Sequence, residues 1–317
     1  MRLFVFDFDG TLGWKGTSYA HITKENGGLL RELAKRDENR VIFATGRPKT
    51  QTLNSVRSGG ISPEEIYNVF FGGVYEDGLY VESREGQIFN ALEETTKSYR
   101  EIREGMFDDD ARLYFFSKGY FLLKGRRLRE VKEEGGCSFV NAENFNGDTL
   151  GNFQLPPGII PLWQQENDVK QTYKLPLGSK KDSLVELSPI FDKIYNITLQ
   201  YFNQRFPGWE KSLTLEKWED AVEIYPHLTG EHHFIKGEGV AKLVLDLDKG
   251  TEVVLCCDGR NDISMVNYLS KKFTNCRVFC PSNVSKELRK HLQDEGIKHN
   301  ILEEDCDKFM EGLIKSI

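Results

Sequence analysis

LFVFDFDGT, residues 3–11, is the stretch that decides the expected fold of this chain. The apolar run over residues 3–6 ends at a turn signal, which predicts a strand buried on both faces, as in a parallel sheet. Asp7 and Asp9 stand two residues apart, so both point the same way from the carboxyl end of that strand, and Gly10 allows a sharp turn. Open α/β sheets bind ligands at this edge, although an Asp-Gly pair alone also marks an ordinary turn.

Three later polar clusters each follow an apolar run or open a helix. Strands are expected over residues 40–44 and 251–257, each followed at once by polar residues, and an amphipathic helix is expected from residue 236. The side chains concerned are Thr45, Gly46, Lys236, Asp258, Asn261 and Asp262. Because the carboxyl ends of parallel strands meet at one edge of a sheet, we expect these residues to join Asp7 and Asp9 there.

Strands alternate with helices in the first and last thirds of the chain. This pattern predicts an α/β fold, with a doubly wound, mostly parallel, Rossmann-like core sheet covered by helices on both faces. The middle of the chain differs in character and predicts an inserted α+β domain, or cap. The expected domains are core residues 1–73, a cap over residues 74–226, and core residues 227–317.

Several individual elements can also be placed. A third core strand is expected over residues 68–73, and a hairpin with strands at residues 79–81 and 87–89. A further strand is expected over residues 112–116. Ser188 followed by Pro189 is typical of an N-cap and first helical residue, so a helix is expected to begin there.

Composition and charge narrow the class of protein. The net charge of −7 over 317 residues argues against a general nucleic-acid binder, which would carry a basic face. No apolar run reaches the length of a membrane span, and the first strand leaves no room for a signal peptide. The six cysteines show no CxxC spacing, so free thiols and a cytoplasmic location are expected.

The residue types at the expected edge suit phosphoryl transfer. Several carboxylates offer the oxygen ligands that a hard cation such as Mg²⁺ prefers. A carboxylate can attack phosphorus and form an acyl phosphate, and a lysine can neutralise charge on the transferring group. A threonine hydroxyl followed by a glycine at a helix start, as at Thr45 and Gly46, suits a phosphate oxygen, although a plain helix cap is an equal alternative.

Four motifs together resemble the haloacid dehalogenase (HAD) superfamily. They are DFDGT at residues 7–11, ATGR at 44–47, IKGEGVAKL at 235–243 and CDGRNDISM at 257–265. The insertion between the second and third motifs resembles the type II cap arrangement. Lys236 followed by Gly, with VEIYP upstream, is similar to the IIB-like subgroup that contains sugar-phosphate phosphatases and phosphomannomutases.

The resemblance implies a role for each motif residue. Asp7 would be the nucleophile and a metal ligand. Asp9 would be the general acid and base, with its backbone carbonyl on the metal and its proton affinity raised by neighbouring carboxylates. Thr45, Gly46 and Lys236 would hold the phosphoryl oxygens. Asp258 would bind the metal, and Asp262 and Asn261 would support it directly or through its ligands.

The implied function is a Mg²⁺-dependent phosphatase that hydrolyses a small phosphate monoester, a sugar phosphate above all, through an aspartyl phosphate. The same motifs would serve a phosphomutase that returns the phosphoryl group to a sugar. A binding protein on a retired enzyme scaffold is a third reading, against which the intact charged residues Asp7, Asp9, Lys236 and Asp258 argue. No residue of the expected cap matches a specificity motif.

Overall fold

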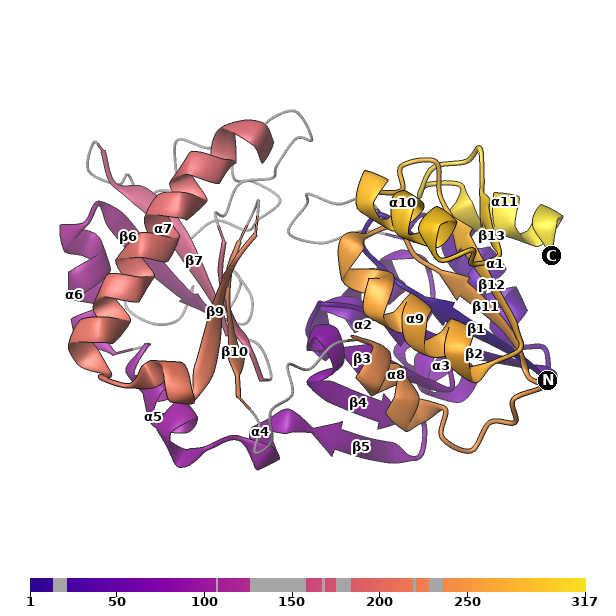
Figure 1. Cartoon of the computed structure of the whole chain (residues 1–317), viewed down its shortest axis with the longest axis horizontal. Coiled ribbons are helices and arrows are strands. Elements are labelled where there is room, and N and C mark those ends of the chain that lie inside the picture. Colours follow the sequence, from indigo (N-terminus) through magenta and orange to yellow (C-terminus); the bar gives the residue numbers. More distant parts are fainter. Residues whose placement is uncertain are drawn as a thin grey trace. The chain divides into compact units, whose positions relative to one another are not determined.

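The computed structural model of the chain describes residues 1–13, 22–106, 108–125, 158–166, 169–174, 184–218, 221–227 and 236–317. These residues form two compact units (Figure 1). The first unit contains residues 1–13, 22–90 and 236–317, and the second contains the described residues between 91 and 227. The first unit is therefore built from two stretches of chain that flank the second.

The first unit is organised around an eight-stranded sheet with the strand order β13-β12-β11-β1-β2-β3-β4-β5. Its strands are β1 (Arg2–Phe6), β2 (Asn39–Ala44), β3 (Gly72–Tyr75), β4 (Tyr80–Ser83), β5 (Gly86–Asn90), β11 (Glu252–Cys256), β12 (Asn275–Cys280) and β13 (His299–Ile301). The strands from β13 to β3 are parallel, and β4 and β5 are antiparallel. The expected α/β class with a mostly parallel core sheet is confirmed.

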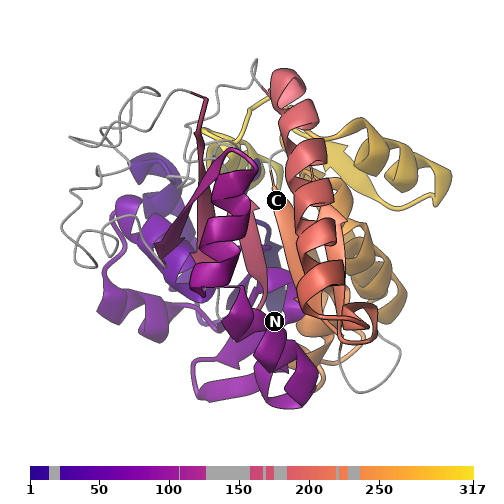
Figure 2. The same cartoon turned by 90° about the vertical axis from the view of Figure 1, so that its left-hand side faces the viewer.

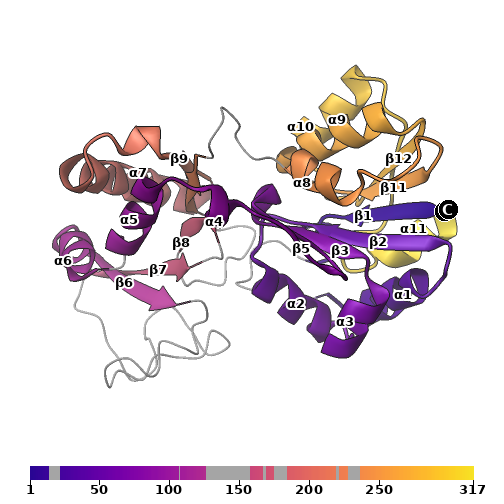
Figure 3. The ribbon, with the colours of Figure 1, turned by 90° about the horizontal axis from the view of Figure 1, so that it is seen from below.

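Helices cover both faces of this sheet, as Figure 3 shows. They are α1 (Lys24–Ala34), α2 (Lys49–Ser58), α3 (Pro63–Val69), α8 (Lys236–Leu243), α9 (Ile263–Lys272), α10 (Lys286–Asp294) and α11 (Phe309–Ser316). Helices α1, α2, α3 and α11 pack in one hydrophobic cluster with Phe4, Phe6 and Phe43. Helices α8, α9 and α10 lie on the opposite face (Figure 3).

β1 lies in the middle of the sheet because both of its faces are apolar. Its Phe6 is level with Phe43 of β2 on one side and with Cys256 of β11 on the other. Residues 3–6 are completely buried, as the continuous apolar run predicts. The equal register means that the residues following β11, β1 and β2 leave the sheet side by side at one edge.

The third strand begins later than expected, whereas the expected hairpin is present and belongs to the first unit. Residues 68–69 belong to α3, and β3 begins only at Gly72. The hairpin β4–β5 extends the first unit's sheet, because Val81 of β4 pairs with Val74 of β3. The first unit therefore continues to residue 90, whereas the sequence placed the boundary at residue 73.

The second unit has a five-stranded sheet with the order β6-β7-β8-β10-β9. Its elements are α4 (Ala91–Glu94), α5 (Lys97–Gly105), α6 (Asp109–Ser117), β6 (Tyr120–Gly125), β7 (Ile160–Glu166), β8 (Gln171–Lys174), α7 (Leu184–Arg205), β9 (Leu213–Lys217) and β10 (Val222–Pro226). Helices α6 and α7 lie on the same face of the sheet (Figure 2), and their aromatic side chains form a separate hydrophobic core with it. The expected α+β character of this segment is observed.

Two elements of the second unit correct the sequence analysis. The expected strand over residues 112–116 is part of helix α6, whose start is capped by the Asp108 side chain. Helix α7 begins at Leu184 and contains Pro189 inside it, so Ser188 is not its N-cap. Among the helices that the structure describes, none has both the length and the apolar character needed to cross a bilayer.

Candidate active site

The expected site residues come from three neighbouring strands and one helix start. Asp7 and Asp9 follow β1, Thr45 follows β2, Asp258 follows β11, and Lys236 is the first residue of α8. Asp258 and Asp262 lie on either side of the turn that leads from β11 into α9. The edge predicted from the sequence therefore exists, and it lies wholly within the first unit.

A buried ion triad forms the centre of the site. The Lys236 Nζ atom lies 2.5 Å from Asp7 Oδ1 and 2.7 Å from Asp262 Oδ1. Asp262 is fixed in turn, because its Oδ2 atom accepts a hydrogen bond of 3.0 Å from the Gly259 backbone N–H. All three side chains of the triad are buried. Lys236 thus fixes the orientation of Asp7.

The electrostatics of the triad follow from its burial. Burial raises the pKa of Asp7 well above its usual value; Asp262 and Asp258 add to this effect, and Lys236 opposes it. Burial lowers the pKa of Lys236, but Asp262, Asp7 and Asp77 outweigh it, so the net pKa is well above the usual value. The single positive charge of Lys236 cannot neutralise the negative charges of both Asp7 and Asp262. The site therefore favours the binding of a further cation.

The donor set for such a cation is present. Asp7, Asp258 and Asp262 each offer a carboxylate oxygen, and these three oxygens lie within 4.8 Å of one another. The Thr11 hydroxyl lies 3.5 Å from Asp7 Oδ2 and 3.4 Å from Asp258 Oδ1. Carboxylate oxygens are the ligands that Mg²⁺ prefers, so the residues present fit this ion.

Asp258 approaches the backbone of Gly10 very closely. Gly10 has a φ of +82°, and a Cβ atom built on it would lie 2.3 Å from Asp258 Oδ2. Its carbonyl accepts a hydrogen bond of 2.8 Å from the Asn283 side chain, which holds the turn. Glycine at this position therefore allows both the turn after β1 and the approach of the carboxylate.

Asp9 is held by a residue to which the sequence analysis gave no role. Arg47 Nε donates to Asp9 Oδ2 and an Arg47 terminal nitrogen donates to Asp9 Oδ1, both at 2.5 Å. Both carboxylate oxygens of Asp9 therefore accept hydrogen bonds from one guanidinium. Besides burial, Asp262 and Asp258 raise the pKa of Asp7, and the raised proton affinity of Asp9 stays a prediction.

The Thr45–Gly46 loop lies at the end of β2. Thr45 is buried, and its hydroxyl oxygen accepts a hydrogen bond of 3.1 Å from the Arg47 backbone N–H. The Thr45 hydroxyl also has a hydrogen to donate, which suits an anion. The Asp77 carboxylate lies over Gly46, because both of its oxygens are 3.0 Å from the point where a Gly46 Cβ would be.

The structure places Asn261 away from the cluster and adds three residues to it. Asn261 is exposed, and among the described residues no hydrogen bond joins its side chain to the cluster. Arg47, Thr11 and Asp77 contribute to the site although no role was predicted for them. Arg47 and Thr11 lie inside two of the motifs, whereas no local pattern identified Asp77.

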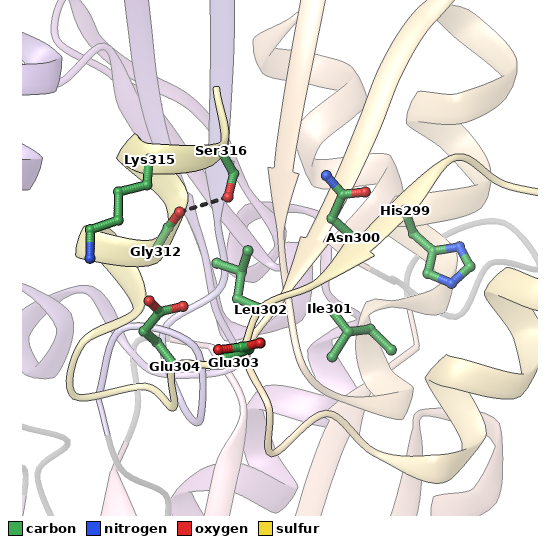
Figure 4. Close-up of a pocket in the computed structure, with 9 residues that line it drawn as sticks. All are labelled: His299, Asn300, Ile301, Leu302, Glu303, Glu304, Gly312, Lys315 and Ser316. Atoms are coloured by element: carbon green, nitrogen blue, oxygen red, sulfur yellow. Dashed lines mark hydrogen bonds between the residues drawn. The ribbon is translucent and has the colours of Figure 1, made fainter.

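A surface hollow of about 580 Å³ lies elsewhere in the first unit (Figure 4). It is lined by β13 residues, by Leu302, Glu303 and Glu304, and by Gly312, Lys315 and Ser316 of α11. The Ser316 hydroxyl donates to the Gly312 carbonyl across 2.8 Å, as drawn in Figure 4. None of the expected site residues lines this hollow, so we do not assign the chemistry to it.

The chain resembles known proteins along nearly its whole length. The model of the family described as haloacid dehalogenase-like hydrolase matches residues 4–274. The C-terminal domain of trehalose-6-phosphate phosphatase from C. albicans is 16% identical over 98% of this chain and 90% of that domain, with a TM-score of 0.56. A protein from Eubacterium rectale is 14% identical over 100% of this chain and 99% of its own, with a TM-score of 0.52. No curated protein sequence matches significantly. The two solved structures support the fold.

Proposed function

The chain belongs to the haloacid dehalogenase-like hydrolases, and on that premise we propose that it is a Mg²⁺-dependent phosphatase that hydrolyses a small phosphate monoester through an aspartyl phosphate on Asp7. The observation that carries the proposal is the buried contact of Lys236 with Asp7 and Asp262, next to Asp258. A nucleophile held by an ammonium, beside a set of oxygen ligands, is what phosphoryl transfer to a carboxylate requires.

Asp7 performs the first step. One of its carboxylate oxygens attacks phosphorus, so a P–O bond to Asp7 forms while the P–O bond to the ester oxygen breaks. The bonding electron pair leaves with the ester oxygen, which takes a proton from Asp9. Lys236 keeps Asp7 aimed through its 2.5 Å contact, and Thr45, Gly46 and Lys236 hold the phosphoryl oxygens.

Asp9 also serves in the second step. It takes a proton from the attacking water, an O–P bond forms from that water, and the bond between phosphorus and Asp7 breaks to release phosphate. Asp9 must carry a proton when the ester bond breaks, whereas in this structure both of its carboxylate oxygens accept hydrogen bonds from Arg47. We therefore expect the contact between Arg47 and Asp9 to open when substrate binds.

Asp7 and Asp258, together with the backbone carbonyl of Asp9, would hold Mg²⁺. Asp262 would support this site through Lys236, whose ammonium donates a hydrogen bond of 2.7 Å to Asp262 Oδ1. When bound, the ion neutralises charge on the phosphoryl oxygens. The excess of carboxylates over ammonium in the triad supports this assignment.

A sugar phosphate is the substrate class that we propose. It is supported by the likeness in fold to a trehalose-6-phosphate phosphatase domain and by the second unit, which is inserted between Thr45 and Lys236 as a type II cap would be. The described cysteines are free thiols, which supports a cytoplasmic location.

A phosphate-release screen tests this proposal. The protein with Mg²⁺ is offered sugar phosphates, nucleotides and phosphoglycolate, and we expect release of phosphate that is highest for a sugar phosphate. Asp7→Asn is nearly isosteric, so it should fold as the natural protein does while turnover falls by roughly 10³-fold or more. Asp37→Asn, at an exposed position before β2, is the matched control and should keep full activity.

Each other result has a definite meaning. No phosphate release from any monoester would overturn the phosphatase proposal. Full activity of Asp7→Asn would show that another group is the nucleophile. An isomerised sugar phosphate, formed only with a bisphosphate activator and with little free phosphate, would identify a phosphomutase instead.

A further inference from the structure

The loop that joins β12 to α10 contacts both of the turns that lead out of β1 and β11, beside the candidate metal ligands. The Asn283 side-chain amide donates a hydrogen bond of 2.8 Å to the Gly10 carbonyl, in the turn that follows β1. Two residues later, the Ser285 backbone N–H donates a hydrogen bond of 2.8 Å to the Asp258 carbonyl, directly after β11. One short loop therefore connects the backbone next to Asp9 with the backbone of Asp258 itself.

Hydrogen bonds away from the site hold this loop in place. The Val284 N–H donates to the Pro281 carbonyl at 3.1 Å, which closes a turn within the loop. The Ser282 N–H donates to the Glu304 carbonyl at 3.0 Å, in the segment after β13. The loop ends at Ser285, whose side chain caps the start of α10. The loop is therefore fixed by neighbouring elements of the first unit and can serve as a support for the two turns.

The Asn283 side chain is used as a donor to the Gly10 turn. Its Oδ1 atom is buried and accepts no hydrogen bond from the described residues. A buried acceptor without a donor lowers stability. The amide cannot turn over to relieve this cost, because Oδ1 would then face the Gly10 carbonyl, which is also an acceptor. The contact with the Gly10 backbone is therefore the interaction that this side chain contributes.

The two turns lie against each other, so their spacing sets the geometry of the ligand cluster. The Asp258 carboxylate occupies the space that a Cβ atom on Gly10 would need. Thr11 follows Gly10 directly, and its hydroxyl lies 3.5 Å from Asp7 Oδ2 and 3.4 Å from Asp258 Oδ1. A displacement of Gly10 would therefore change the separation between the carboxylate oxygens of Asp7 and Asp258.

We propose that Asn283 and Ser285 form a clamp that holds these two turns at the spacing a small cation needs, and so sets the preference of the site for Mg²⁺ over Ca²⁺. This inference rests on the proposed function, because it takes Asp7 and Asp258 as metal ligands. Mg²⁺ demands nearly octahedral coordination at about 2.0 to 2.1 Å, whereas Ca²⁺ accepts irregular coordination at about 2.3 to 2.6 Å. A site whose turns can move apart therefore loses affinity for Mg²⁺ first. Asn283 acts through the Gly10 turn and is a positioning residue.

The test removes the donor of Asn283 and keeps the volume of its side chain. Asn283→Leu is titrated with Mg²⁺ and, separately, with Ca²⁺ in a calorimeter, so the readout does not depend on turnover. We expect the affinity for Mg²⁺ to fall by roughly tenfold, the lower end of the losses seen when groups that orient metal ligands are removed. The affinity for Ca²⁺ should change far less, so the ratio of the two affinities should fall. Asn283→Ala removes the same donor with less bulk and should give the same change in preference.

Asn39 offers a matched control in the same unit. Its side-chain amide also donates to a backbone carbonyl, that of Leu33 at 2.9 Å, and its Oδ1 is likewise buried without a partner among the described residues. It is the first residue of β2, whereas Thr45 and the site lie at the other end of that strand. Asn39→Leu should therefore lower stability as Asn283→Leu does, and leave the affinities for both ions unchanged.

The other outcomes separate the clamp from the metal site. Unchanged Mg²⁺ affinity in Asn283→Leu and Asn283→Ala, or an equal loss of affinity for the two ions, would overturn the clamp. A similar loss of preference in Asn39→Leu would also overturn it, because general destabilisation would then explain the effect. If the natural protein bound neither ion, the proposed metal site would be wrong, and the inference with it.

Discussion

At the scale of single residues, the site depends on charges that neutralise one another out of water. The side chains of Lys236 and Asp262 have no solvent exposure, and that of Asp7 has 5%. An ammonium in this position both stabilises the fold and orients the nucleophile. A buried charge that loses its partner is far more costly than an exposed one.

Lys236→Met should therefore destabilise the metal-free protein strongly. We expect the free energy of unfolding to fall by about 3 to 5 kcal/mol, because Asp7 and Asp262 would stay buried without a cation. Urea unfolding with a chelator present measures it. Lys315→Met breaks an exposed contact with Glu311, which water and salt screen, so it should cost far less stability than Lys236→Met. Equal losses in the two variants would contradict the role of the triad.

The raised pKa of Asp7 gives a second residue-scale prediction. A carboxyl whose pKa is higher in the folded than in the unfolded state loses stability as pH rises from the unfolded value, near 4, through the folded value. Asp7→Asn lacks this loss. In the presence of a chelator, the stability of Asp7→Asn relative to the natural protein should therefore rise between pH 4 and pH 8. A difference that stays flat with pH would show that Asp7 is not perturbed.

At the scale of elements, the turn after β1 combines a backbone requirement with a close contact. Gly10 has a positive φ, and the Asp258 carboxylate lies where its Cβ would be. Gly60 offers a comparison, since its φ of +86° is similar while a Cβ there would meet nothing within 4 Å. A substitution at Gly60 would therefore introduce backbone strain alone, whereas one at Gly10 would introduce the same strain and a steric clash with Asp258.

Gly10→Ala and Gly60→Ala should share a loss of about 1 to 2 kcal/mol in stability, which is the cost of the left-handed backbone. Only Gly10→Ala should displace Asp258, so we expect its affinity for Mg²⁺ to fall by roughly tenfold or more. Calorimetric titration with Mg²⁺ measures this difference. Equal Mg²⁺ affinity in both variants would mean that Asp258 is not a ligand.

The sequence predicted the elements that carry strong patterns. β1 and β11 are continuous apolar runs followed at once by acidic residues, and in the sheet they are neighbours. The start of α8 at Lys236 also agrees with the prediction. These segments bring the four motif clusters together. A strand that is apolar on both faces must lie inside the sheet, which leaves few possible positions for it.

The errors have identifiable causes. The third strand begins later than predicted because the capping box of Ser62 and Glu65 opens α3, which includes residues 68–69. Residues 112–116 read as a strand because of their aromatic residues, but the Asp108 cap starts a helix there. Asp77 could not be predicted at all, because its place over Gly46 depends on a strained turn between distant segments.

At the scale of the whole molecule, the two units have separate hydrophobic cores. One cluster contains Phe4, Phe43 and Phe309 of the first unit, and the other contains Tyr99, Phe202 and Trp209 of the second. The candidate metal ligands all belong to the first unit. A ligand that binds this site therefore stabilises the first unit directly, and not the second.

Mg²⁺ should consequently raise the unfolding temperature of the first unit without moving that of the second. At a concentration of about 100 times its Kd, the ion adds roughly 2.7 kcal/mol to the unit that binds it. In a variant whose Trp14 is replaced by phenylalanine, the remaining tryptophans belong to the second unit, and Trp209, buried in its core, reports the unfolding of that unit. On addition of Mg²⁺, the unfolding temperature of the first unit measured by calorimetry should rise, while the one measured by fluorescence should not. An equal rise in both temperatures would show that the two cores unfold together.

The sheet of the first unit is built from segments that lie far apart in the sequence, so some of its strands are synthesised long before their partners. Arg2 of β1 is level with Glu252 of β11, a separation of 250 residues. A ribosome that adds 5 to 20 residues each second makes β1 wait roughly 12 to 50 s for this partner. Until then one edge of the most apolar strand is unpaired, so the nascent chain passes through a stage that is open to aggregation, and chaperone capture would matter most there.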